Sequence, residues 1–228
     1  MKIIARIMTD FKEKFGIPRQ SGIASDAIAK IVFEPEYRVP EALRGIDGYS
    51  HLWLIWEFSE AKREGWSPTV RPPRLGGNKR VGVFATRSPY RPNPVGLSSV
   101  RLISIEHDPT LGDVLVVSGA DMLDGTPIYD IKPYLAYTDS HPEAVGGFAD
   151  GVMGQNLAVE IPRELLARVA EEKRQTLRTI LSGDPRPHYK EDGEYEYGMR
   201  FADYEVKFKV KDGRLTVTDI ALIISKKQ

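Results

Sequence analysis

A run of basic residues in the middle of the chain is the feature most able to do chemistry on a ligand. Between Glu64 and Glu106 there is no Asp or Glu, although the whole chain of 228 residues has a net charge of +0. This segment carries seven cations, which are Arg71, Arg74, Lys79, Arg80, Arg87, Arg91 and Arg101. A surface that carries only positive charges, in a protein whose net charge is zero, suits the binding of phosphates or nucleic acid. A solvated basic loop is the alternative interpretation.

The stretch from Arg71 to Ser98 also predicts a shaped site, because it is rich in residues that fix or free the backbone. Proline restricts φ and glycine permits unusual φ values, so such loops have defined shapes. The residues concerned are Pro72, Pro73, Gly76, Gly77, Pro89, Pro92, Pro94 and Gly96. They surround the short apolar run Val81 to Ala85, and loops that flank a strand commonly hold binding groups.

Other short polar motifs are spread over the first two thirds of the chain. They are Gly16 to Gln20, Phe58 to Glu60, Leu123 to Pro127 and Asp130 to Tyr134. Each alone is typical of a turn or loop end, as at Pro18 and at Asp124-Gly125. Arg19 and Arg87 are equally compatible with surface ion pairs, which contribute little to stability.

Several reaction classes are disfavoured because their signatures are missing from the sequence. There is no GxGxxG, no GxxxxGK[ST] and no GxSxG, which argues against a dinucleotide fold, a P-loop NTPase and an acyl hydrolase. The chain has no cysteine, which excludes disulfides and thiolate catalysis. Its four histidines lack metal-ligand spacing, so we expect no metal.

The elements that must position these motifs are mostly strands, because short apolar runs alternate with turn residues at the spacing of a sandwich or barrel. Predicted strands are Lys2 to Met8, Ala27 to Phe33, His51 to Phe58, Arg80 to Thr86, Val95 to Ile105, Asp113 to Ala120 and Ile128 to Tyr134. The near-continuous apolar run around Trp53 predicts a strand covered on both faces. Trp53, Trp56 and Phe58 are interpreted as core residues.

A different pattern begins near Ile161 and predicts a small α+β domain. Apolar residues recur at helical spacing from Pro162 to Gly183, which predicts one helix. Tyr195 to Phe201 predicts a strand, and alternation on both sides of Asp212-Gly213 predicts a hairpin. We therefore divide the chain into a β domain over residues 1–155 and a C-terminal domain over residues 156–228.

The sequence shows no run of the ~20 apolar residues needed to cross a membrane. Its N-terminus alternates charged and hydrophobic residues too early for a signal peptide. A cytoplasmic protein with no membrane partner is expected.

Taken together, the motifs resemble the family of tRNA methyltransferases called TrmO. The resemblance is carried by FGIPRQ, YSHLWLIWEF, RPPRLGGNKRVGVFATRSPYRPNPVGLS, MLDGTPIYDIKPY, DPRPHY and YGMRFADYEV, which cover nearly the whole chain. It implies an S-adenosylmethionine-dependent enzyme built on a β-barrel, without a Rossmann-like fold. It further implies methylation of N6 of N6-threonylcarbamoyladenosine, beside the anticodon of threonine tRNA, by a homodimer.

The resemblance also assigns residues to two sites. The cofactor site would comprise Pro18, Arg19, Gln20, Ser59, Glu60, Arg87, Leu97, Asp124, Gly125, Thr126 and Pro127. The tRNA surface would comprise Arg71, Arg74, Lys79, Arg80, Arg91, Asp184, Arg186 and Tyr189. Many relatives have His-Gln where this chain has Ser59-Glu60, so only a backbone contact at Ser59 is expected to be retained. An internal Asp184 to Arg186 bridge is the alternative for the DPRPHY element.

Further roles stay open at this point. Tyr90 and Trp66 could stack on bases of the anticodon loop, or pack within their own loop. Tyr129 or Asp130 could assist loss of a proton, but ordinary packing roles explain both, and the sequence assigns no catalytic base. Two other functions remain alternatives: a non-catalytic RNA-binding β module, and an enzyme that uses another small adenosyl ligand.

Overall fold

A computed structural model describes residues 1–61, 65–72, 79–152, 156–186 and 195–223. The strands are β1 (Ala5–Met8), β2 (Ile28–Phe33), β3 (His51–Glu57), β4 (Thr69–Val70), β5 (Val81–Gly82), β6 (Val95–Asp108), β7 (Gly112–Ser118), β8 (Pro127–Pro133), β9 (Ala158–Glu160), β10 (Tyr197–Phe201), β11 (Tyr204–Lys211) and β12 (Arg214–Leu222). The α-helices are α1 (Ala136–Asp139), α2 (Arg163–Leu166) and α3 (Glu171–Ser182). Short 3₁₀ helices are η1 (Pro35–Tyr37), η2 (Pro40–Leu43), η3 (Ile46–Gly48), η4 (Ser59–Ala61), η6 (Val83–Ala85) and η7 (Gly147–Val152).

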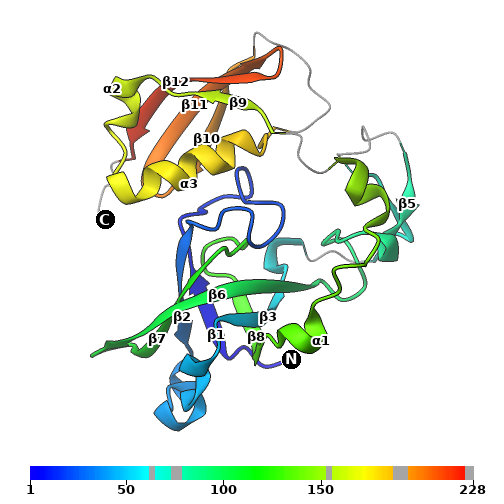
Figure 1. The fold of residues 1–228 in the computed structure, drawn as a ribbon, viewed down its shortest axis with the longest axis vertical. Coiled ribbons are helices and arrows are strands. Elements are labelled where there is room, and N and C mark those ends of the chain that lie inside the picture. The colour runs from blue at the N-terminus through cyan, green and yellow to red at the C-terminus, as the bar shows by residue number, and fades with distance from the viewer. Residues whose placement is uncertain (62–64, 73–78, 153–155, 187–194, 224–228) are drawn as a thin grey trace.

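Six strands of the N-terminal part form a closed antiparallel barrel in the order β1-β2-β7-β6-β3-β8 (Figure 1). Neighbouring strands alternate in direction around this ring. The β1–β2, β3–β6 and β7–β8 connections therefore all emerge at the same end of the barrel. These connections carry the Gly16 to Gln20, Arg71 to Pro94 and Leu123 to Thr126 motifs, so the topology gathers the motifs that the sequence separates.

The barrel interior is filled by aliphatic side chains from alternate strand positions. Ile7, Ile31, Leu52, Leu54, Leu115 and Ile128 are all fully buried. The predicted class, a mainly β barrel followed by a small α+β part, is confirmed. The main differences in strand ends are that β1 begins at Ala5 rather than Lys2 and β6 extends to Asp108 rather than ending at Ile105.

Strand β3 is less evenly covered than its sequence predicts. Leu52, Leu54 and Trp56 are buried, whereas Trp53 and Ile55 are only partly buried. The outer face is covered in part by α1, because Trp53 Nε1 donates a hydrogen bond of 2.8 Å to Asp139 Oδ2. The near-continuous apolar run thus corresponds to one buried face and one half-covered face.

The predicted strand from Arg80 to Thr86 is wrong beyond its first residues. Only Val81–Gly82 pairs with a neighbour, β4, and the chain then turns into η6. Thr86 closes this turn, since its N–H and its Oγ1 both donate to the Val83 carbonyl, at 3.1 and 2.8 Å. A local turn therefore replaces strand pairing, and it exposes Phe84 while Val83 stays buried.

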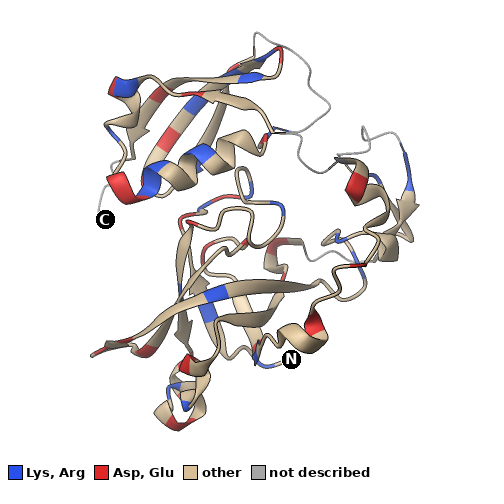
Figure 2. Ribbon diagram, in the orientation of Figure 1, with Lys and Arg blue, Asp and Glu red and all other residues tan. Residues whose placement is uncertain are grey.

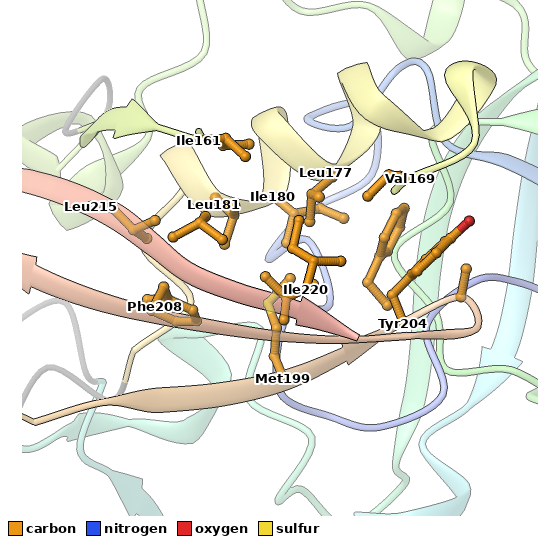
Figure 3. Packing of buried hydrophobic residues seen from close by; sticks show 14 of the residues in the cluster. Ile161, Val169, Leu177, Ile180, Leu181, Met199, Tyr204, Phe208, Leu215 and Ile220 are labelled. Carbon is orange, nitrogen blue, oxygen red and sulfur yellow. The ribbon is translucent and has the colours of Figure 1, made fainter. Parts of the chain in front are cut away.

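The C-terminal part is a four-stranded sheet, β10-β11-β12-β9, with α3 packed on one face (Figure 3). Leu177, Leu181 and Phe208 meet in a core separate from the barrel interior. The predicted hairpin is confirmed: Asp212 and Gly213 have φ values of 48° and 72° between β11 and β12. Two positive φ values match the twist of the flanking strands.

The single helix predicted from Pro162 to Gly183 is wrong, because it is interrupted between α2 and α3. Two side chains satisfy backbone groups at this interruption. Tyr204 Oη accepts the Ala170 N–H at 3.1 Å, and Arg174 Nε donates to the Val169 carbonyl at 2.8 Å. Tertiary hydrogen bonds therefore stabilise a break that helical periodicity does not reveal.

The β1–β2 connection joins the two parts of the molecule. Phe11, Ala24 and Ala27 lie in the hydrophobic core of the C-terminal sheet rather than in the barrel. Lys173 Nζ and Asp10 Oδ2 form an ion pair of 2.5 Å. The motif-bearing end of the barrel thus contacts the C-terminal sheet. No helix in the described ranges is long and apolar enough to span a membrane.

Candidate functional site

The Pro18 to Gln20 loop contacts two other motifs. Arg87 Nη1 donates a hydrogen bond to Gln20 Oε1, which joins this loop to the β3–β6 connection. Arg19 Nη2 donates to the Asp184 carbonyl at 2.9 Å, which joins it to the C-terminal DPRP segment. Three predicted site segments therefore meet at this loop.

Ser59 and Glu60 lie immediately beyond β3, in η4. Lys14 Nζ, from the β1–β2 connection, lies 3.1 Å from the Glu60 carbonyl oxygen and 3.2 Å from Oε2 of its carboxylate. The N–H of Phe58 donates to the Pro94 carbonyl at 2.8 Å. This turn is therefore held between the β1–β2 connection and the start of β6.

The Asp124 to Pro127 turn is fixed to the end of β1. Asp124 accepts the Thr9 N–H at 2.8 Å through Oδ1, and its Oδ2 lies 2.8 Å from Lys12 Nζ. Gly125 has a φ of 77°, and among the described residues beyond its chain neighbours no heavy atom lies within 4 Å of the position that a Cβ would take. The Asp124 carboxylate is thus engaged in holding the turn, whereas the surface over Gly125 is open to a ligand.

Leu97 is an exposed apolar residue between two buried positions of β6. Its side chain is 58% exposed, while Gly96 and Ser98 on either side are buried. It pairs with Ile55 of β3 and faces out of the barrel. An outward leucine near polar loops provides apolar surface for a ligand.

A partly buried carboxylate, Asp121, lies beside these residues. Ser98 Oγ donates a hydrogen bond of 2.5 Å to Asp121 Oδ1 and accepts one of 2.9 Å from Trp56 Nε1. Burial raises the pKa of the Asp121 carboxyl, although hydrogen bonds from Ser98 and the Ser21 backbone oppose this shift. Asp121 directly precedes the MLDGTP motif but carries no sequence signal of its own, because only its contact with Ser98 in the folded chain distinguishes it.

The two residues considered for proton removal have other partners. Burial and the neighbouring Glu57 raise the pKa of Tyr129 to about 12, so its phenol stays protonated at neutral pH. Asp130 Oδ2 lies 3.0 Å from Lys132 Nζ, and its Oδ1 accepts the Ile131 N–H at 3.0 Å. These contacts favour structural roles for both residues.

Other basic residues of the β3–β6 connection adjoin β4 and β5 in the sequence, where Figure 2 shows basic segments in blue. Arg71 and Lys79 are exposed. Arg80 Nη1 donates to Thr69 Oγ1 at 3.0 Å, and Arg91 Nη1 donates to the Thr86 carbonyl at 3.1 Å. Two other predicted tRNA contacts, Arg74 and Tyr189, lie outside the described residues.

Asp184 and Arg186 form a bidentate pair. Arg186 donates to both carboxylate oxygens, at 2.8 and 2.9 Å, and this hydrogen bonding raises the pKa of Arg186. Asp184 is buried and adopts a φ of 51°. The internal bridge considered from the sequence is therefore present. Because Arg19 contacts the carbonyl of the same Asp184, this bridge also shapes the Pro18 to Gln20 loop.

Across the ranges that the structure describes, no group of three or more His, Cys, Asp or Glu side chains could hold a metal ion. The site consists instead of turns, backbone groups, arginines and one exposed apolar side chain.

The fold and site define a β-barrel protein whose predicted site loops share one end and contact a C-terminal α+β part. Residues 6–140 match the family described as tRNA-methyltransferase O N-terminal domain, and residues 154–223 match the TrmO C-terminal domain. The chain belongs to the TrmO family.

Individual relatives agree with this assignment over nearly the full length. The tRNA (adenine(37)-N6)-methyltransferase of Escherichia coli strain K12 is 39% identical over 223 residues, with 94% of each chain covered. A protein of Pseudomonas aeruginosa named as a putative S-adenosylmethionine-dependent methyltransferase is 40% identical, with 96% of each covered. A crystal structure of TrmO from Pseudomonas aeruginosa matches with a TM-score of 0.76 at 33% identity, covering 96% of this chain and 97% of that one.

Proposed function

We propose that this protein is an S-adenosylmethionine-dependent methyltransferase acting on N6 of adenosine 37 in tRNA. The observation that carries the proposal is the meeting of the Pro18 to Gln20 loop, Arg87 and the DPRP segment at one end of the barrel. The E. coli relative that matches over 94% of the chain is named for this reaction. The finer substrate that we propose is N6-threonylcarbamoyladenosine in threonine tRNA.

The residues at this end of the barrel fit such a cofactor. Leu97 supplies exposed apolar surface, the open space over Gly125 admits a ring or ribose, and Arg87 supplies a cation for a polar group. Backbone groups of the Ser59-Glu60 and Asp124-Gly125-Thr126 turns can recognise an adenine edge without a glycine-rich phosphate loop. We therefore propose Pro18, Arg19, Gln20, Ser59, Glu60, Arg87, Leu97 and Asp124 to Pro127 as the cofactor site.

The cofactor supplies an electrophilic methyl group on a sulfonium, so the protein must chiefly orient the two reactants and exclude water. Methyl transfer breaks the sulfur–carbon bond, forms a nitrogen–carbon bond and releases the N6 proton. The barrel end suits this task because its loops are fixed by contacts on several sides. Arg19 is held at Asp184 and Lys14 at Glu60, so the loops are joined to each other as well as to the strands.

We further propose that the two parts of the chain have different roles, one in catalysis and one in tRNA contact. Residues 1–155 would form the catalytic domain, with Arg71, Arg74, Lys79, Arg80 and Arg91 contacting tRNA phosphates. Residues 156–228 would form a tRNA-contacting domain that uses Asp184, Arg186 and Tyr189. A homodimer would let one subunit hold tRNA at the partner's pocket. Because tRNA is the substrate, we expect the protein to act in the cytoplasm.

The deciding experiment is mass spectrometry of tRNA nucleosides after incubation with enzyme and S-adenosylmethionine. The substrates are threonine tRNA that carries threonylcarbamoyladenosine and the same tRNA with unmodified adenosine 37. We expect one added methyl group on the modified nucleoside. Methylation of the unmodified adenosine alone would contradict the finer substrate, and no methylation of either would contradict the reaction.

Calorimetry distinguishes the alternative functions. A non-catalytic RNA-binding module would bind tRNA but would not bind S-adenosylmethionine. An enzyme for another adenosyl ligand would bind that ligand without methylating tRNA.

A further inference from the structure

Two aromatic side chains of the β3–β6 connection are exposed and lie next to each other. Phe84 is 71% exposed and Trp66 is 53% exposed. Their ring centroids are 5.9 Å apart, with 32° between the ring planes. Single exposed apolar side chains are common, but a contiguous apolar patch often marks a binding site.

The exposure of Phe84 follows from the backbone that holds it. Val83 is buried, and its N–H donates to the Pro68 carbonyl at 2.9 Å. Thr86 closes the turn from the other side through its contacts with the Val83 carbonyl. Phe84 therefore projects from a turn that is fixed on both sides.

A guanidinium group completes this aromatic surface. Arg91 lies 5.9 Å from the centroid of the Phe84 ring, and it is held by its hydrogen bond to the Thr86 carbonyl. Arg80 and Lys79 lie in the same connection, which contains no acidic residue from position 65 to position 105. The surface thus combines π-faces with positive charge.

We propose that Phe84, Trp66 and Arg91 form a stacking platform for an unpaired base of the tRNA anticodon loop. This inference rests on the proposed function. An unpaired base is planar and is flanked by phosphates, so it suits an aromatic surface surrounded by cations. A second copy of the chain is a poorer occupant, because a two-fold interface here would bring the same cations together.

The test measures binding of a fluorescent anticodon stem-loop RNA at several salt concentrations. Replacing Phe84→Ala should weaken binding about 5- to 100-fold, as expected for loss of one stacked base. The slope of log affinity against log salt should not change, because no cation is removed. Replacing Arg80→Ala should instead lower the magnitude of that slope by about 1.

Tyr137→Ala is the matched control, because Tyr137 on α1 is an aromatic residue that is 88% exposed outside this platform. Its affinity should equal that of the wild type. Unchanged RNA affinity in Phe84→Ala would overturn the platform, and so would loss of a dimer without loss of RNA affinity. A wild-type protein that binds no RNA would overturn the proposed function as well.

Discussion

Replacing Gly96→Ala tests how the site end of the barrel is packed. A Cβ at this position would lie 2.2, 2.4 and 2.7 Å from three ring carbons of Trp56, distances at which atoms overlap. Trp56 is buried and contacts Phe58, with ring centroids 4.2 Å apart. The indole ring must therefore move, and its hydrogen bond to Ser98 must lengthen or break.

The cost has two parts. Inserting a methyl group into a packed core destabilises by about 1–3 kcal/mol. A buried indole N–H that loses its acceptor adds about 1–3 kcal/mol. The free energy of unfolding should therefore fall by about 2–6 kcal/mol. At about 2–4 °C per kcal/mol for a chain of this size, Tm should fall by about 4–24 °C.

Thermal and urea unfolding of purified variants measure this loss. Gly82→Ala is the matched control, since a Cβ there would meet no heavy atom within 4 Å in the described part of the chain beyond its own neighbours. Its change should stay within about 0.5 kcal/mol. The double variant Gly96→Ala with Trp56→Phe should lose less unfolding free energy than the sum of the two single variants. The reason is that phenylalanine lacks the fused ring that the new methyl group would overlap. An unchanged Tm for Gly96→Ala, or strict additivity in the cycle, would refute this account of the packing.

Three further outcomes follow from the pKa shifts and the buried ion pair. Tyr129→Phe should keep the shape of the rate profile from about pH 7 to 10, because the phenol, with a pKa of about 12, does not ionise there; loss of the alkaline limb would contradict this. The Leu135 N–H and Trp53 hold the pKa of Asp139 below 3.8, so its stabilisation is complete above that pH and is lost as pH falls through the depressed pKa. The free energy of unfolding should therefore fall less steeply with decreasing pH below 3.8 in Asp139→Asn than in the wild type. Identical pH dependence in the two proteins would contradict this. Asp184→Asn should cost about 2–4 kcal/mol in urea unfolding because it leaves the Arg186 guanidinium without its carboxylate, and a loss below about 1 kcal/mol would contradict that.

Much of the barrel could be predicted because its strands combine local alternation with strong turn residues. The Asp212-Gly213 hairpin needs only two residues with positive φ, and these two residue types favour it. The meeting of distant motifs was accessible only by resemblance, since strand order around a ring depends on long-range pairing. Once that order is known, the alternation of strand direction explains why the three connections share one end.

The two wrong predictions have different physical causes. The apolar run at Val81 to Ala85 has strand composition, but local hydrogen bonds from Thr86 to the Val83 carbonyl favour a turn. The interruption before α3 depends on a tertiary contact with Tyr204, which lies far along the sequence from Ala170. Asp121 has no pattern around it, because only the folded chain brings Ser98 to its carboxylate.

The hydrogen bond between Phe58 and Pro94 has a consequence for how such a protein can diversify. It closes the β3–β6 connection at its base, where the two flanking strands are already paired. Each doubling in the length of a flexible connection costs only about 0.6 kcal/mol of closure entropy. The segment between Phe58 and Pro94 can therefore be lengthened, shortened or exchanged while the barrel keeps its register. This segment is a natural position for grafting a new recognition surface onto an unchanged scaffold.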